Sequence, residues 1–178
     1  MIKNIKTPLD AKTIKSLRAG DRVLISGTLY VARDAAHKKG IPVKLKGQII
    51  FYAGPTPAVP ADRQGKLIGS IGPTTSSRMD PFTIPLLEKG LAGMIGKGAR
   101  GEDIKKAIKK YKSVYFAATG GAAALLGKTV KKSEIVAYPE LGPEAVLKIE
   151  VSNFPAVVAY DSFGGDLFKE GIKKFRTK

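Results

Sequence analysis

Short apolar runs alternate with helix-like segments along most of the chain, and glycine, proline or a polar cluster ends each run. Apolar runs of about four to eight residues that stop at turn residues are typical of buried strands. This pattern predicts strands at residues 21–31, 48–53, 66–71, 91–95, 114–118, 131–138, 145–151 and 156–160. It predicts helices, or helix-competent turns, at residues 13–18, 32–39, 81–89, 102–110, 122–126 and 166–175. The proline-containing segment up to Gln64 is expected to be a loop.

The alternation of strands and helices predicts an α/β fold, with partly parallel strand pairing in the middle of the chain. Both ends of the chain are richer in expected strands. The sequence shows no internal repeat and no linker-like segment, so we expect residues 1–178 to form a single domain. Gly27, inside the strand predicted over 21–31, indicates either a β-bulge or a break between two paired strands.

The loop at residues 72–80 is the most distinctive stretch, because its sequence Gly-Pro-Thr-Thr-Ser-Ser-Arg-Met-Asp combines four consecutive hydroxyls with an arginine. Asp80 is a favourable helix N-cap, and Pro81 suits the first helical position. Such a loop presents backbone N–H groups and the positive end of the helix dipole, and Arg78 adds a guanidinium suited to carboxylate or phosphate. The stretch is therefore either an anion receptor or an ordinary polar loop with Arg78 in solvent.

Four expected strands end in loops marked by glycine or arginine, at residues 32–37, 72–80, 96–98 and 119–121. Ligands of open α/β sheets bind at the carboxyl ends of strands. If these ends converge, one pocket with two or three positive charges contains Arg33, Thr74, Arg78 and Lys97, which suits a small dicarboxylate. The Gly-Lys-Gly sequence at 96–98 also fits a plain turn, and it is not a P-loop because neither Ser nor Thr follows the lysine.

His37 and Asp34 are further candidate site residues beside Arg33. His37 lies four residues after Arg33, so on a helix the two side chains share a face, and the imidazole could orient a ligand or act as acid or base. The other interpretation is that this single histidine is a hydrogen-bonded structural residue. Both interpretations remain open from the sequence.

The net charge of +16 makes nucleic acid a natural first hypothesis for a partner. The lysines are spread along the chain, however, and many fall on the polar faces of expected helices, such as those at 105–110 and 169–174. The sequence contains no basic–aromatic motif and no helix-turn-helix or zinc-finger signature. We therefore expect no specific nucleic-acid binding, and assign the remaining charge to an acidic partner or an anionic substrate.

The complete lack of cysteine excludes disulfides, zinc–thiolate sites and a self-contained iron–sulfur cluster. One histidine and fifteen carboxylates leave little for a metal site built by this chain alone. No segment approaches the roughly 18 apolar residues of a membrane-spanning helix. Residues 1–6 lack the apolar core of a secretory signal. These features predict a soluble, cytoplasmic protein with no membrane partner.

Several motifs occur in an order that resembles one enzyme family. They are Arg-Asp-Ala-Ala-His at 33–37, Gly-Pro-Thr-Pro at 54–57, the 72–80 loop, Gly-Lys-Gly at 96–98 and the segments 157–161 and 164–167. In these motifs the chain resembles the β subunit, or C-terminal region, of class I (iron–sulfur) fumarate hydratase and L-tartrate dehydratase. The resemblance covers nearly the whole chain, and the 33–37 and 72–80 motifs are its most specific parts.

The resemblance implies a swivelling β/β/α domain and a hydro-lyase, with reversible hydration of fumarate to malate preferred over dehydration of tartrate. It also implies that cysteines of a partner α subunit hold a 4Fe–4S cluster, in a heteromer for which a heterotetramer is one arrangement. By the same resemblance, Arg33, Arg78 and Lys97 bind the substrate, and Thr74 is the proposed base. The rival interpretation is a non-catalytic anion- or nucleic-acid-binding module, supported only by the charge.

Overall fold

The structure, a computed structural model, describes residues 2–57 and 68–176. Its strands are β1 (Ile2–Lys6), β2 (Arg22–Val31), β3 (Ile49–Phe51), β4 (Ala53–Pro57), β5 (Ile68–Pro73), β6 (Gly93–Gly96), β7 (Val114–Ala117), β8 (Val130–Ala137) and β9 (Val146–Tyr160). Its α-helices are α1 (Ala11–Ser16), α2 (Asp34–Lys39), α3 (Asp80–Glu88), α4 (Glu102–Tyr111), α5 (Ala123–Thr129) and α6 (Leu167–Phe175). The 3₁₀ helices of the described residues are η2 (Ser76–Met79) and η3 (Pro139–Glu144).

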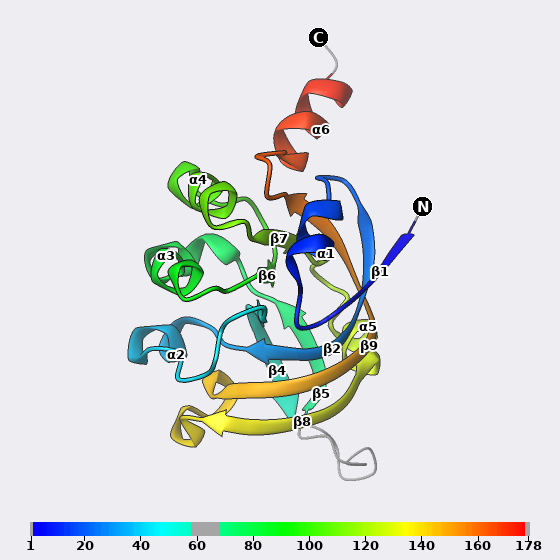
Figure 1. The fold of residues 1–178 in the computed structure, drawn as a ribbon. Coiled ribbons are helices and arrows are strands. Elements are labelled where there is room, and N and C mark those ends of the chain that lie inside the picture. The colour runs from blue at the N-terminus through cyan, green and yellow to red at the C-terminus, as the bar shows by residue number, and fades with distance from the viewer. Residues whose placement is uncertain (1, 58–67, 177–178) are drawn as a thin grey trace.

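Seven strands form a mixed sheet in the order β1-β2-β3-β6-β7-β9-β8, and a further pairing of β2 with β9 joins strands on the two sides of this order. Strands β2, β3, β6, β7 and β9 therefore close into a hydrogen-bonded ring (Figure 1). The pairs β1–β2, β2–β3, β3–β6 and β6–β7 are parallel, whereas β9 pairs antiparallel with β2, β7 and β8. The predicted α/β fold with a mixed sheet is thus confirmed.

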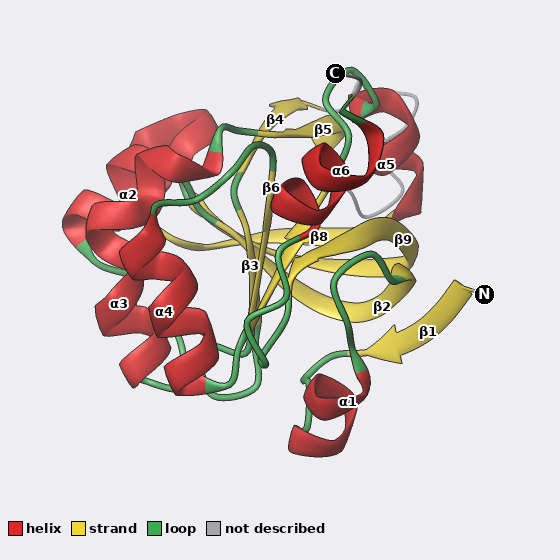
Figure 2. Ribbon diagram, turned by 90° about the horizontal axis from the view of Figure 1, so that it is seen from above, coloured by secondary structure: helices red, strands yellow, loops and turns green. Residues whose placement is uncertain are grey.

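Two clusters of buried side chains lie on opposite faces of the ring strands. The inner cluster includes Ile25, Phe51, Phe116 and Ile149. The outer cluster lies between the strands and helices α2, α3 and α4 and includes Ala36, Ile50, Leu87, Ile104 and Tyr115. Figure 2 shows these three helices together on one flank of the strands. Because β3, β6 and β7 are covered on both faces, their sequences are continuously apolar, which made them recognisable from the sequence.

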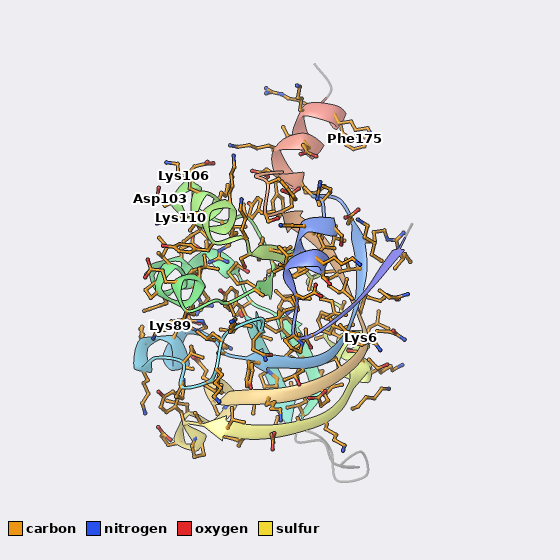
Figure 3. The ribbon with its side chains drawn as sticks, viewed as in Figure 1. Lys6, Lys89, Asp103, Lys106, Lys110 and Phe175 are labelled. Atoms are coloured by element: carbon orange, nitrogen blue, oxygen red, sulfur yellow. The ribbon has the colours of Figure 1, made fainter. Side chains whose placement is uncertain are left out.

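The parallel strands β2, β3, β6 and β7 all end at the same edge of the sheet, and helices α2 and α4 start shortly after β2 and β6. This arrangement brings the predicted ligand-binding loops to one end of the molecule. Lys106, Lys109 and Lys110 of α4 are exposed, whereas Lys105 is half-buried and pairs with Asp166 at 2.9 Å. Figure 3 shows Lys106 and Lys110 extending outward, as expected for a solvated helix face.

The structure differs from the sequence prediction in several strands. Strand β1 was not predicted, and the two strands expected at 145–151 and 156–160 are one continuous strand, β9. The segment expected at 48–53 is divided between β3 and the start of β4. Among the described residues, strand β5 pairs only with β4, in a separate two-stranded sheet, and not with the central strands. Most of the loop predicted up to Gln64, and the first two positions of the strand predicted at 66–71, lie outside the described residues.

Gly27 lies at an irregularity within the continuous strand β2, although the extra residue of the bulge is on β9, where Ser152 and Asn153 stand opposite Ser26. The φ of Gly27 is 108°, and the pairing of β2 with β9 shifts register between Ile25 and Gly27. A positive φ at this point is readily adopted only by glycine, so the share of β2 in this irregularity is encoded locally. In residues 2–57 and 68–176, no helix has the length and apolar character required to cross a bilayer.

Candidate functional site

The loops after β5 and β6 are joined by backbone hydrogen bonds around Lys97. The Lys97 N–H donates to the Thr74 carbonyl at 3.1 Å, and the Lys97 carbonyl accepts from the Ser76 N–H at 2.9 Å. The Thr74 N–H donates to the Tyr52 carbonyl, just after β3, at 2.8 Å. A β-carbon added at Gly120 would lie 3.8 Å from Lys97 Nζ, so the lysine side chain lies over the 119–121 loop. The loops at 72–80, 96–98 and 119–121 therefore meet.

The fourth loop, at 32–37, joins this cluster through an ion-pair network. Arg78 Nη2 lies 2.7 Å from Asp34 Oδ2, and Arg33 Nε lies 3.6 Å from the same oxygen. Arg33 Nη2 lies 3.3 Å from Glu144 Oε1. A β-carbon at Gly54 would lie 2.9 Å from Arg33 Nη1, so any larger residue there would displace the guanidinium. Asp34 thus links Arg33 and Arg78, and Arg33 is confined on three sides by Asp34, Glu144 and Gly54.

The two arginines differ in their access to solvent. The Arg78 side chain is 48% exposed, whereas the Arg33 side chain is 24% exposed. Asp34 and Glu144 balance the charge of both guanidiniums, so Lys97 is the excess cation of these five side chains. The sequence alone predicted two or three positive charges, because it did not reveal that Glu144 lies beside Arg33.

Thr74 Oγ1 is buried and has no hydrogen-bond partner among the described residues. A buried polar atom that lacks a partner is costly, and such atoms are rare in native proteins. The hydroxyl therefore retains its full hydrogen-bonding capacity for a ligand that reaches the 72–80 loop. This environment distinguishes Thr74 from Ser76, whose Oγ accepts from the Tyr115 hydroxyl at 2.9 Å.

His37 is a buried residue of helix α2, and only 5% of it is exposed. Its Nδ1 lies 2.8 Å from the Arg33 carbonyl oxygen, which can only accept, so Nδ1 carries the proton and donates. The ring packs against Tyr52 and Phe82, with centroid distances of 5.4 and 6.0 Å. Burial lowers the pKa of His37, with Arg100 acting in the same direction and the Arg33 carbonyl and Asp34 opposing it. The neutral imidazole thus fixes the turn that carries Arg33.

Arg100 anchors the 72–80 loop and was not identified from the sequence. Its buried guanidinium donates from Nε to Asp80 Oδ1 at 2.5 Å and from Nη2 to Thr83 Oγ1 at 2.7 Å. Its Cζ lies 5.4 Å from the ring centroids of both Tyr52 and Tyr115. The only signal for it in the sequence was its place at the end of a glycine-rich loop, which is weak.

Asp80 does not have the capping role that its sequence context predicted. Helix α3 begins at Asp80 itself, and its N-cap, Met79, makes no side-chain capping bond. The Asp80 carboxylate instead accepts from Arg100 and, through Oδ2 at 2.8 Å, from the Gly101 N–H. The prediction was wrong because a buried guanidinium twenty positions away is a stronger partner than the first turn of the helix.

The described residues contain no group of three or more His, Cys, Asp or Glu side chains that could hold a metal ion. The sequence also contains no cysteine. The part of the chain that the structure describes therefore offers no ligand set for an iron–sulfur cluster.

Comparison with known proteins supports the family resemblance. The fumarase C-terminus family model matches residues 2–171. The chain is 39% identical over 160 residues to the aerobic class I fumarate hydratase of Salmonella typhimurium, covering 84% of this chain and 27% of that protein. It is 39% identical over 183 residues to a putative L(+)-tartrate dehydratase subunit beta of Methanocaldococcus jannaschii, covering 96% and 93%. It is 37% identical over 182 residues to fumarate hydratase 2 of Leishmania major, covering 95% and 31%.

The chain thus spans less than a third of the length of these two fumarate hydratases, but nearly all of the tartrate dehydratase subunit. The family match extends over all four loops that form the cluster around Arg33, Arg78 and Lys97. The chain belongs to the fumarase C-terminus family.

Proposed function

We propose that residues 1–178 act as one domain that supplies the substrate-binding half of a hydro-lyase active site. The substrate is a small dicarboxylate, and the preferred reaction is the reversible hydration of fumarate to malate. Dehydration of L-tartrate is the alternative, and the names of the relatives support both. The observation that carries the proposal is the meeting of four loops that present Arg33, Thr74, Arg78 and Lys97.

In this proposal Arg78 binds one substrate carboxylate directly. It is the more exposed arginine, and Nη2 makes its ion pair with Asp34, so we assign its other guanidinium donors to the substrate carboxylate. Arg33 and Lys97 bind the remaining carboxylate and the hydroxyl oxygens. Removal of a C–H proton next to the carboxylate that Arg78 binds builds up negative charge on that carboxylate, and the preorganised donors of Arg78 stabilise this charge more than they stabilise the substrate.

Thr74 is proposed to transfer the proton at the carbon atom. A threonine hydroxyl is a poor base in water, so this role needs an environment that favours its anionic form. Two features support the role: Oγ1 is buried without a partner among the described residues, and its loop also carries Arg78 and contacts Lys97. Nearby cations lower the pKa of a hydroxyl, and exclusion of water strengthens their effect.

We further propose that a partner α subunit carries a 4Fe–4S cluster and completes the site. The cysteine-free sequence and the lack of a metal-binding group among the described residues are consistent with a cluster held elsewhere. The relative that the chain covers almost completely is named as a subunit beta. The steps assigned to this chain are therefore binding, orientation and proton transfer, and none of them involves the cluster. A heterotetramer with two copies of each subunit is one arrangement of the heteromer.

Reconstitution tests this proposal. The purified chain is expected to be colourless and inactive, with or without added iron. Anaerobic mixing with a cluster-bearing partner should give a brown complex that co-purifies and turns over fumarate, malate or tartrate. Rates with the three substrates would identify the preferred reaction. Fumarate hydration by this chain alone without iron, or a stable complex inactive on all three substrates, would refute the assignment.

A further inference from the structure

Helix α2, which follows Arg33, is held at its C-terminal end by the segment Tyr138–Glu144. The Tyr138 hydroxyl donates to the carbonyls of Lys39 and Gly40 at 3.2 and 3.0 Å. Lys39 also pairs with Glu140, and its Nζ lies 4.7 Å from the centroid of the Tyr138 ring. These contacts satisfy carbonyl groups that the end of a helix leaves without intrahelical partners.

The N-terminal end of α2 is held by Glu144 from the same segment. Glu144 Oε2 accepts from the Ala35 N–H at 2.8 Å. Arg33, the N-cap residue, makes no side-chain capping bond, so Glu144 provides the acceptor that an N-cap side chain usually provides. The segment therefore contacts both ends of the helix that carries the site arginine.

The second oxygen of the Glu144 carboxylate faces Arg33 itself. Oε1 lies 3.3 Å from Arg33 Nη2, while Oε2 is occupied by the Ala35 N–H. Two donors from different groups thus face two acceptors on one side chain. Only a carboxylate provides two acceptor oxygens here, because the amide of glutamine offers one acceptor and presents its NH₂ to the second donor.

We infer that Glu144 is a positioning residue that fixes the Arg33 guanidinium for substrate binding. The inference rests on the function proposed above and adds a residue that the site motifs do not contain. Because the Ala35 N–H holds the Glu144 carboxylate in place, the carboxylate restrains Arg33 from a fixed point. Glu144 and Arg33 are 28% and 24% exposed, so solvent screens their interaction less than that of a fully exposed pair.

The test compares two glutamates of the same segment in the assembled enzyme. Glu144→Gln is expected to raise KM for the dicarboxylate roughly tenfold while kcat stays within about threefold, because Arg33 binds substrate and transition state alike. The matched control is Glu140→Gln, which removes the same charge from the same segment but acts at Lys39. The control is expected to leave KM unchanged.

Amide hydrogen exchange at Ala35 provides a readout that is independent of activity. Glutamine keeps one carbonyl oxygen for the Ala35 N–H, so Glu144→Gln should retain the protection of this amide, whereas Glu144→Ala should lose it. A purely structural role of Glu144 would change protection and stability without changing KM. For Glu144→Gln we expect the opposite result, in which the Ala35 amide keeps its protection from exchange and KM is raised.

Two results would overturn the inference. A KM within twofold of wild type in Glu144→Gln would show that the charge does not position Arg33. A KM below wild type would show that Glu144 competes with the substrate instead. Arg78→Lys, assayed in parallel, separates this inference from the proposed function. If Arg78→Lys retains full activity, the proposed function fails; if it is impaired and Glu144→Gln is not, only the inference about Glu144 fails.

Discussion

Replacing Arg78 with lysine is the most direct test of the proposed site, because it keeps the positive charge and removes the planar guanidinium. In the structure one nitrogen of this group, Nη2, is committed to Asp34 at 2.7 Å. A guanidinium has further N–H donors with which to bind a carboxylate, whereas lysine has a single ammonium nitrogen. A lysine at this position could pair with Asp34 or with the substrate, but it could not hold both in the same geometry.

The expected loss follows from the donor that is removed. Loss of one preorganised donor to developing charge costs about 2–4 kcal/mol of transition-state stabilisation, which lowers kcat/KM between about 30-fold and about 1000-fold. The effect on folding should be much smaller. Arg78 is half exposed, and its ion pair with Asp34 is worth no more than about 1 kcal/mol after solvent screening. For a chain of 178 residues this corresponds to a change in Tm of about 2–4 °C.

The assay measures kcat/KM and Tm of the assembled complex for wild type and Arg78→Lys. Arg22→Lys is a matched control, because Arg22 is an exposed arginine at the other end of β2 from Arg33. The control should leave both quantities unchanged. The reasoning is refuted if Arg78→Lys keeps kcat/KM within about twofold of wild type, or if its Tm falls by many degrees, since the arginine would then be idle or structural.

Two further predictions concern charge. Burial lowers the pKa of His37 below 6.5, so the unfolded chain binds the additional proton, and the free energy of unfolding should decrease as the pH falls through the range below about 6.5. Because His37 is the only histidine, urea unfolding at several pH values should show this component in wild type and not in His37→Gln, and an identical pH dependence in both would contradict it. Despite the net charge of +16, duplex DNA should bind only non-specifically, with Kd on the order of 10⁻⁴–10⁻⁶ M and a steep decrease with salt. Sequence-selective binding at physiological salt would instead favour a nucleic-acid-binding module.

Features that depend on neighbouring residues were predictable from the sequence, whereas the choice of distant partners was not. Gly27 was recognised as the site of a bulge or a strand break because its backbone preference is local. The two strands expected at 145–151 and 156–160 form one strand, β9, in which Pro155 pairs with Leu24. The irregularity lies at Asn153, which has a φ of 55° and donates its N–H to Ser26 Oγ. The sequence pattern does not show that β2 supplies this support.

The candidate site divides in the same way. Arg78 and Lys97 were visible because glycines and hydroxyls surround them in the sequence, and such loops have a recognisable chemistry. The residues that hold these loops were not visible. Glu144 acts on a backbone amide 109 positions away, and Arg100 acts on a carboxylate 20 positions away. Their roles arise from tertiary contacts, so no local pattern marks them.

The closure of the strand ring by β2 and β9 has a consequence for how the chain folds. The contact between Thr28 and Glu150 joins positions 122 residues apart, and the same two strands pair over most of their length. Chains dominated by such distant pairings lose much conformational entropy before the contacts form, and they fold in about milliseconds to seconds. During synthesis β2 and β7 are made before β9. Until β9 is made, the edge of each strand that will pair with β9 stays unpaired, and it can associate with other chains. Completion of the ring therefore depends on the late arrival of residues 146–160, and we expect the nascent chain to be most prone to aggregation just before that strand is made.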